Sequence, residues 1–221
     1  MTGISADSAR ILGVFGGTFD PVHCGHVAVA DALMRALPLS RIVFVPAARP
    51  PHRPAPSAGA RDRLAMLRLA LASDQRFVID ETEYEREGPS YMVDTLAILR
   101  AHHAQPLALI LGMDAFVSLP AWHRWRRILG LAHVVIVSRP GLDGTLPAWV
   151  RPRLAGRAET LLTADSGRAF LFTASARPES ATALREGLAD GTAPASWLPD
   201  GVPDYIEAHG LYRRSSRNDE S

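Results

Sequence analysis

The chain has 221 residues, of which 47% are hydrophobic, so it is long enough for one sizeable α/β domain and its composition argues against disorder. A formal net charge of +1 gives no reason to expect nucleic acid or an anionic membrane as a partner, and one cysteine excludes an internal disulfide. All 24 cationic side chains are arginines, which excludes a P-loop lysine and Schiff-base chemistry. The first ten residues do not resemble a signal peptide, and no apolar run is long enough to span a bilayer, so we expect a cytoplasmic protein.

A glycine- and histidine-rich stretch, residues 16–26 (GGTFDPVHCGH), follows the first apolar run of the chain. That run, residues 11–15, predicts a buried strand, and the helix formers of residues 27–37 predict a helix that stops at Pro38. A glycine turn between a strand and a helix presents free backbone N–H groups and the positive end of the helix to a ligand. The stretch therefore predicts an anion site.

The histidine pair within this stretch has three interpretations. His23 and His26 are three residues apart, so both imidazoles can lie on one side of the first helical turn. They could be ordinary polar residues at a helix start, or the beginning of a metal site, although two histidines need further ligands and Cys24 is a poor addition. The third interpretation, phosphate binding, is favoured because the full string resembles the GGTFDPxHxGH signature of the nucleotidyltransferase superfamily.

Later in the chain, short apolar runs alternate with segments of helical periodicity. The further predicted strands are residues 41–45, 77–80, 107–111, 134–138 and 170–173. The further predicted helices are residues 61–72, 92–102 (with Ser90 as a candidate N-cap), 180–188 and 202–209. Between them we expect a proline-rich surface loop at residues 46–60, a solvated strand extension or hairpin at 81–87, and an irregular or short helical insertion at 142–167.

This alternation predicts an α/β fold, a Rossmann-like doubly wound and mainly parallel sheet with helices on both faces. We expect a flexible N-terminus at residues 1–9, a single domain at 10–213 and a polar tail at 214–221. In such folds ligands bind at the carboxyl ends of the strands, where the strand order reverses. The glycine turns that follow the first and fourth predicted strands are expected to flank that point.

Further motifs carry a resemblance to the bacterial nicotinate-mononucleotide adenylyltransferases over almost the full chain. They are FVPA (44–47) with PPHR (50–53), GPSY (88–91), LGMD (111–114), WHRW (122–125), VSRPG (137–141) and SATALR (180–185). The resemblance implies transfer of an adenylyl group from ATP to nicotinate mononucleotide, giving deamido-NAD and pyrophosphate, a step of NAD biosynthesis. It also implies Mg²⁺ bound through the ATP phosphates, no metal site formed by side chains, and a homodimer as an open possibility.

The resemblance assigns roles residue by residue. The implied catalytic residues are His23 and His26, which bind the triphosphate and the transferring phosphate. The other implied ATP-binding residues are Gly16, Gly17, Thr18, Phe19, Gly112, Asp114, Ser180, Thr182 and Arg185. The implied nicotinate mononucleotide-binding residues are Arg53, Tyr91, Met92, Trp122, His123 and Arg139. Trp122 would stack on the pyridine ring, Gly112 and Asp114 would hold the adenylate ribose, and backbone N–H groups near Met92 and His123 would receive the nicotinate carboxylate.

The chain departs from the family pattern at four positions. Met92 replaces the threonine of an SYT motif, and Arg53 replaces a lysine. In the late motif, Ala181 replaces the second serine and Glu179 replaces an apolar residue. The departure at Met92 affects one expected contact with the acceptor, and the departures in the late motif affect one expected contact with a phosphate.

No nucleophilic or general-base side chain is required for this reaction. The attacking group is a phosphate monoester whose second pKa is about 6, so it is already mostly dianionic at neutral pH. The protein has to align two anions and stabilise the charge that develops on pyrophosphate. Two alternatives remain: a nucleotidyltransferase for another acceptor, such as nicotinamide mononucleotide, phosphopantetheine or a small alcohol phosphate, and a nucleotide sensor without catalysis.

Overall fold

The computed structural model describes residues 10–51, 55–139, 146–175 and 177–213. The segments expected as a flexible N-terminus and a polar tail, residues 1–9 and 214–221, lie outside the described residues. One six-stranded sheet runs through the described part, in the order β3-β2-β1-β4-β5-β6 with every pairing parallel. Its strands are β1 (Ile11–Gly17), β2 (Leu39–Pro46), β3 (Phe77–Ile79), β4 (Leu107–Gly112), β5 (His133–Ser138) and β6 (Ala169–Thr173).

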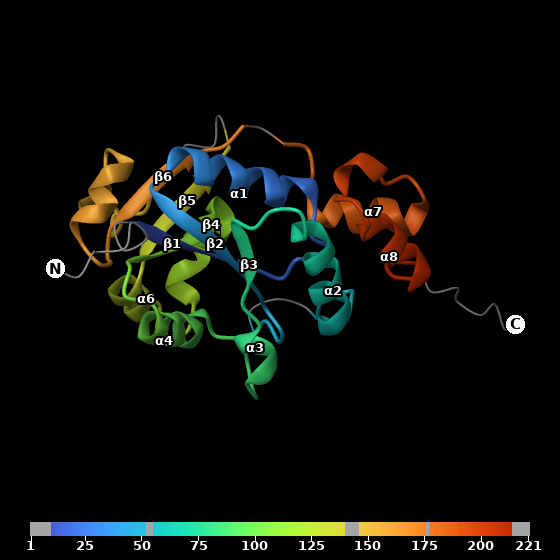
Figure 1. The fold of residues 1–221 in the computed structure, drawn as a ribbon, viewed down its shortest axis with the longest axis horizontal. Helices are drawn as coiled ribbons and strands as arrows, with labels where there is room; N and C mark the ends of the chain where they lie inside the picture. The colour runs from blue at the N-terminus through green and yellow to red at the C-terminus, as the bar shows by residue number, and fades with distance from the viewer. Residues whose placement is uncertain (1–9, 52–54, 140–145, 176, 214–221) are drawn as a thin grey trace, which may run out of the picture.

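The helices cover both faces of this sheet (Figure 1), with α1 on one side and α4 and α6 on the other. The α-helices are α1 (Cys24–Ala36), α2 (Ala60–Leu71), α3 (Thr82–Glu85), α4 (Met92–His102), α5 (Met113–Ser118), α6 (Trp125–Leu131), α7 (Ala181–Asp190) and α8 (Val202–Ala208). The short 3₁₀ turns are η1 (Leu119–Ala121), η2 (Arg151–Arg153), η3 (Ala158–Thr163) and η4 (Ala195–Trp197). The predicted doubly wound α/β fold is confirmed.

The apolar runs of the strands feed two separate cores. Along β1, Ile11 and Phe15 pack into the core beneath α1 and α2, whereas Leu12 and Val14 pack into the core beneath α4 and α6. Successive side chains of a strand point to opposite faces, so a strand covered on both sides has to be apolar at every position. This explains why the strands were recognisable as uninterrupted apolar runs.

The strand order reverses between β1 and β4, which are neighbours in the sheet although β2 and β3 intervene in sequence. From β1 the chain proceeds outward to β2 and β3, and from β4 it proceeds outward in the other direction to β5 and β6. The carboxyl ends of β1 and β4, at Gly17 and Gly112, therefore border the point of reversal, as the sequence predicts.

Two local predictions are wrong. Residues 81–87 were expected to be a solvated extension or hairpin, but they contain α3, and Glu83 within it is only 3% exposed. Charge density suggested exposure there, but a hydrogen bond from the Thr95 hydroxyl to Glu83 Oε1 (2.8 Å) accommodates the buried carboxyl. Ser90 is not the N-cap of α4; Tyr91 is, and the Ser90 hydroxyl instead accepts a hydrogen bond from the Arg49 N–H at 3.0 Å.

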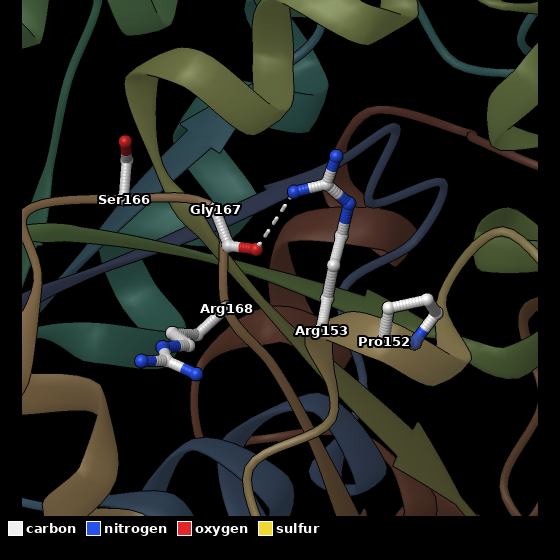
Figure 2. A pocket seen from close by; sticks show the side chains of 5 residues that line it. All are labelled: Pro152, Arg153, Ser166, Gly167 and Arg168. Atoms are coloured by element: carbon white, nitrogen blue, oxygen red, sulfur yellow. Dashed lines mark hydrogen bonds between the residues drawn. The ribbon is translucent and has the colours of Figure 1, made fainter.

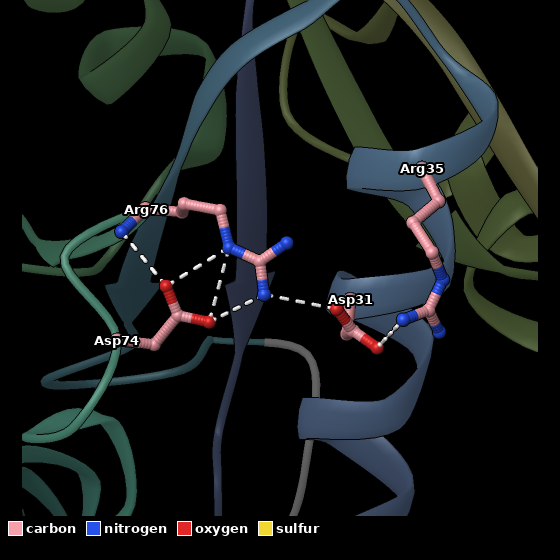
Figure 3. A network of polar contacts seen from close by, with 4 residues as sticks. All are labelled: Asp31, Arg35, Asp74 and Arg76. Carbon is pink, nitrogen blue, oxygen red and sulfur yellow. Dashed lines mark hydrogen bonds and ion pairs between the residues drawn. The ribbon is translucent and has the colours of Figure 1, made fainter.

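A surface network joins α1 to the turn that precedes β3 (Figure 3). The Arg76 guanidinium contacts both Asp31 on α1 and Asp74, and Asp31 also pairs with Arg35 one turn further along the helix. Because Arg35 and Arg76 are exposed and the two carboxylates are only partly buried, water and salt screen these charges, and the network contributes little to stability. Within the described residues, no helix has the length and apolar character needed to cross a membrane.

Candidate active site

The histidine turn connects β1 to α1 at the point where the strand order reverses. β1 ends at Gly17, and α1 starts at Cys24 with His23 as its N-cap, three residues earlier than the sequence suggested. The Nδ1 atom of His26 accepts a hydrogen bond from the backbone N–H of His23 at 3.2 Å. The two imidazole centroids are 3.7 Å apart. The predicted pairing of these rings on one side of the first helical turn is therefore present.

Two glycines allow the turn to approach its neighbours closely. A Cβ on Gly16 would lie 2.5 Å from Met92 Cε, and a Cβ on Gly17 would lie 2.9 Å from Phe19 Cζ. The Phe19 backbone is left-handed, with a φ of 49°, and its buried ring packs edge-on against the imidazole of His26 with centroids 5.1 Å apart. Side chains larger than hydrogen at these glycines would displace Phe19 or Met92, and with them the wall of the turn.

Asp20 and Arg63 hold the turn in place from beneath. The Asp20 carboxylate accepts hydrogen bonds from the backbone N–H groups of Ser57 (2.7 Å) and Ala58 (3.0 Å). Arg63, which is 1% exposed, donates to the carbonyl oxygen of Thr18 at 2.7 Å. The remaining Arg63 acceptors are the carbonyl oxygens of Ala47, Ala48 and Ala58. One guanidinium thus joins the histidine turn to the chain segments that follow β2.

The start of α7 lies against the same turn although it is far away in sequence. The Arg185 Nη1 donates to the carbonyl oxygen of Asp20 at 2.7 Å, and its Nη2 donates to the Thr182 hydroxyl at 3.3 Å. The Ser180 hydroxyl caps α7 by accepting a hydrogen bond from the Ala183 N–H at 3.1 Å. The structure therefore brings the late predicted motif to the histidines.

On the other side of the turn lie the residues expected at the nicotinate end. The Met92 methyl group lies beside Gly16, and the Tyr91 ring stacks on the His123 ring with centroids 4.3 Å apart. Trp122 is partly buried, and its Nε1–H donates to the Ser118 hydroxyl at 3.4 Å. Two segments of the chain, one on each side of β4 in sequence, meet here.

The remaining predicted residues line the same edge of the sheet. Gly112 ends β4 as the N-cap of α5, and the exposed Asp114 lies in the first turn of that helix. Arg139 is exposed and directly follows β5. Arg53 lies outside the described residues.

The electrostatic state of the histidine pair follows from its burial. His23 is 8% exposed, and removal from water lowers its pKa to about 4; the Glu179 carboxylate opposes this change and the Arg139 charge adds to it. Burial, together with the neighbouring His23, also lowers the pKa of His26 well below its usual value. Both rings are therefore neutral at neutral pH in the free protein. Because Nδ1 of His26 is an acceptor, this ring carries its hydrogen on Nε2, whereas His23 can gain a proton when an anion binds beside it.

A separate small pocket is remote from this site (Figure 2). It is lined by Pro152, Arg153, Ser166, Gly167 and Arg168, with Arg153 Nη1 donating to the Gly167 carbonyl oxygen at 3.4 Å. Gly167 and Arg168 directly precede β6, so this pocket lies at the edge of the sheet where the strands begin. It shares no residue with the histidine turn.

Comparisons with known proteins assign the family. The Cytidylyltransferase-like family matches residues 14–187. A probable nicotinate-nucleotide adenylyltransferase of Acidithiobacillus ferrooxidans is 42% identical over 206 residues, which cover 90% of this chain and 94% of that protein. The corresponding protein of Pseudomonas putida is 44% identical over 214 residues, covering 94% of this chain and 97% of its own length. The chain belongs to the nicotinate-nucleotide adenylyltransferase family.

This membership makes the chain a nucleotidyltransferase, and it confirms the predicted function, adenylyl transfer in NAD biosynthesis. Nucleotidyltransferases generally use a divalent cation. A solved structure, the nicotinic acid mononucleotide adenylyltransferase of Plasmodium falciparum complexed with NaAD, matches with a TM-score of 0.69 at 16% identity. It covers 92% of this chain and 97% of its own, and at that identity the likeness supports the fold.

Sequence reasoning missed the residues that support the adenylyltransferase site. Asp20 was part of the opening motif but received no role, and Arg63 was taken only as one position of a packing helix. Glu83 and Glu179 were not expected to be buried, yet both are. A single sequence gives no signal for such roles, because the partners of a buried charge are known only from the fold.

Proposed function

We propose that this chain binds ATP across the histidine turn and α7, binds nicotinate mononucleotide beside Tyr91, Met92 and Trp122, and transfers the adenylyl group directly between them. The proximity of the two halves of the site carries the proposal: Gly16 contacts Met92 on one side, and Asp20 contacts Arg185 on the other. A bond between two nucleotides can form only where their phosphates meet.

The histidines are assigned to the phosphate chain. In this scheme His23 and His26 face the triphosphate, with Gly16, Gly17, Thr18 and Phe19 shaping the turn beneath it. The Nε2–H of His26 and a protonated His23 are donors, which stabilise the negative charge that develops on the leaving pyrophosphate. Arg185, Thr182 and Ser180 add donors from the start of α7, while Arg139 supplies positive charge near the acceptor. The resemblance assigns Arg53 to nicotinate mononucleotide as well.

A divalent cation fits this scheme as a companion of the nucleotide. No group of three or more His, Cys, Asp or Glu side chains suited to a metal occurs in the part of the chain that the structure describes. We therefore expect Mg²⁺ to be held mainly by phosphate oxygens, where it would neutralise part of their charge. The protein's own contribution is to fix the turn that receives the phosphates.

The acceptor side of the proposed site offers a ring platform and backbone donors. Trp122 has the flat apolar face that a pyridine ring can stack on, and the start of α4 at Met92 presents backbone N–H groups to a carboxylate. Gly112 and Asp114 are assigned to the adenylate ribose, because a carboxylate accepts hydrogen bonds from hydroxyl groups. Tyr91 and His123 form the rim between these positions.

The proposed partners are ATP and nicotinate mononucleotide. We expect neither nucleic acid nor a membrane to be involved, and we expect the protein to act in the cytoplasm. A homodimer is a further expectation, which light scattering of the purified protein tests.

The deciding experiment compares turnover with nicotinate mononucleotide and with its amide, measured as pyrophosphate release. We expect the acid to be the better acceptor because its carboxylate meets backbone N–H groups. An amide that is used as efficiently as the acid would overturn the acceptor assignment. ATP binding without pyrophosphate release from any mononucleotide would instead indicate a nucleotide sensor.

A further inference from the structure

A buried carboxylate lies next to the histidine turn. Glu179 immediately precedes Ser180, the N-cap of α7, and is 5% exposed. Its Oε1 pairs with Arg177 Nη2 at 2.7 Å. Its Oε2 is buried and makes no hydrogen bond within the described part of the chain. A buried carboxylate oxygen without a donor is costly, so its retention calls for a partner that arrives during function.

The His23 imidazole also has a buried polar atom that lacks a hydrogen-bond partner among the described residues. Its Nδ1 is also buried; the His26 backbone N–H approaches the His23 side chain across the first turn of α1, but Nδ1 makes no hydrogen bond of normal geometry with any residue that the structure describes. Both groups flank Gly25: the point that a Cβ on Gly25 would occupy is 2.9 Å from His23 Nδ1 and 3.6 Å from Glu179 Cβ. A side chain larger than hydrogen at this position would fill the space between the His23 imidazole and the Glu179 side chain.

We propose that Glu179 is a positioning residue for His23, whose carboxylate accepts the Nδ1–H of the protonated imidazole, directly or through one water. This inference rests on the phosphate-binding role proposed above for His23. With Nδ1–H directed to Glu179, the opposite nitrogen, Nε2, carries its hydrogen toward the phosphate chain. The proton comes from solvent when the polyphosphate binds, and no covalent bond forms or breaks in this step.

The charges around His23 are consistent with this arrangement. Glu179 favours the imidazolium, while Arg139 and the buried surroundings oppose it. His26, on the same helical turn, is itself held neutral by burial and by His23. Arg177 is partly exposed, and its ion pair with Glu179 partly neutralises the carboxylate. The free protein therefore keeps His23 neutral, and a bound anion together with Glu179 supplies the two acceptors that its protonated form needs.

The resemblance noted above implies an apolar residue at the position of Glu179. An apolar neighbour would leave His23 Nδ1 without an acceptor on that side. The substitution thus adds a charged acceptor at the phosphate site rather than merely altering the start of α7.

The test follows the His23 ring by NMR during pH titrations, with and without a non-hydrolysable ATP analogue, and assigns its signals by their loss in His23→Gln. We expect the analogue to raise the pKa of His23 in the wild-type protein. In Glu179→Gln the pKa of His23 in the complex should be lower, and lower still in Glu179→Leu. Arg177→Gln should raise it, because the carboxylate then loses a competing partner.

Kinetics provide a second measurement. Both Glu179 variants should lose about 10-fold in kcat/KM for ATP at about pH 7.5, with KM for nicotinate mononucleotide unchanged. Glu186→Gln removes an exposed carboxylate from α7, the helix that follows Glu179, and should change neither the titration nor the kinetics. Glu179→Gln nearly preserves side-chain size, so it carries the test even if Glu179→Leu fails to fold.

The phosphate-binding role of His23 and the positioning role of Glu179 are disproved by different results. If the ATP analogue leaves the His23 signals of the wild-type protein unmoved, the phosphate role of His23 is wrong. If the analogue shifts them equally in the wild-type protein and in Glu179→Gln, the phosphate role stands and the role of Glu179 is overturned.

Discussion

The two halves of the site differ in how firmly the fold holds them. The histidine turn is anchored by Asp20 and by buried Arg63, and Arg185 of α7 donates to it from the far end of the sequence. On the acceptor side, Trp122 makes a long hydrogen bond, Tyr91 stacks on His123, and Tyr91, Met92 and Trp122 are partly buried against the core beneath α4 and α6. The phosphate side is thus held by several hydrogen bonds to buried charged groups, whereas the acceptor side is held mainly by the packing of rings, and we expect the phosphate side to be the more preorganised of the two.

Preorganisation is most valuable where charge develops. Fixed donors stabilise a leaving pyrophosphate without having to reorganise at the moment of reaction. A pyridine ring and its carboxylate change little in charge during adenylyl transfer, so the residues that bind them mainly determine affinity and specificity. Substitutions in the two halves should therefore separate effects on turnover from effects on acceptor binding.

The largest expected effect is at His26. His26→Ala should reduce turnover by about 100-fold or more, because it removes a donor that acts on the phosphates in the transition state. Pyrophosphate release under saturating substrates measures the effect, and circular dichroism checks the fold. His102→Ala, an exposed histidine at the end of α4, is the matched control and should retain full turnover. Unchanged kinetics in His26→Ala would place the chemistry elsewhere.

Arg63 tests the anchoring of the phosphate side. Arg63→Met should lower the free energy of unfolding by about 2 kcal/mol, because it leaves the partly buried carbonyl oxygens of Thr18 and Ala47 without their donor. Urea titration measures this change. Arg61→Met, an exposed arginine on the same helix, should remain within about 0.5 kcal/mol of the wild type. Equal stability of the two variants would show that the turn does not depend on Arg63.

Trp122 tests the adjustable side. Trp122→Ala should raise KM for nicotinate mononucleotide by about 10-fold, because ring stacking contributes about 1–3 kcal/mol, and KM for ATP should stay the same. Trp122→Phe retains an aromatic face and should recover most of the loss. A parallel rise in both KM values would argue that Trp122 supports the fold rather than the acceptor.

The smallest expected effect is on the pH dependence of stability. The pKa of His23 is about 4 in the folded protein and near 6.5 in the unfolded chain, so the unfolded state binds the proton first as the pH falls. From about pH 6 to about pH 5, this histidine should lower the free energy of unfolding by about 1 kcal/mol. Denaturant titrations should show a smaller loss over this range in His23→Gln. An identical loss would mean that His23 is not buried as a neutral ring.

The fold was predictable because each strand is covered on both faces. Uninterrupted apolar runs such as those of β1 and β4 are typical of a parallel sheet that is buried on both faces. The glycine turns that follow these runs mark the edge of the sheet where ligands bind. The strand order did not follow from the sequence, because nothing in a local pattern records which strand lies beside β1.

Buried charges were the part of the site that the sequence concealed. The acidic run around Glu83 resembles a solvated segment until Thr95 is placed against it. Glu179 looked like a defect in a phosphate motif, although its position beside His23 and Gly25 suggests a use for it. Such residues are recognised from their partners, and those partners lie far away along the chain.

The links to Asp20 join residues that are far apart in sequence. Arg185 donates to the carbonyl oxygen of Asp20, and the Tyr212 hydroxyl donates to its carboxylate at 2.7 Å. Contacts between residues so far apart in sequence require the closure of long loops. We therefore expect the histidine turn to reach its final shape only after α7 and Tyr212 have docked on it.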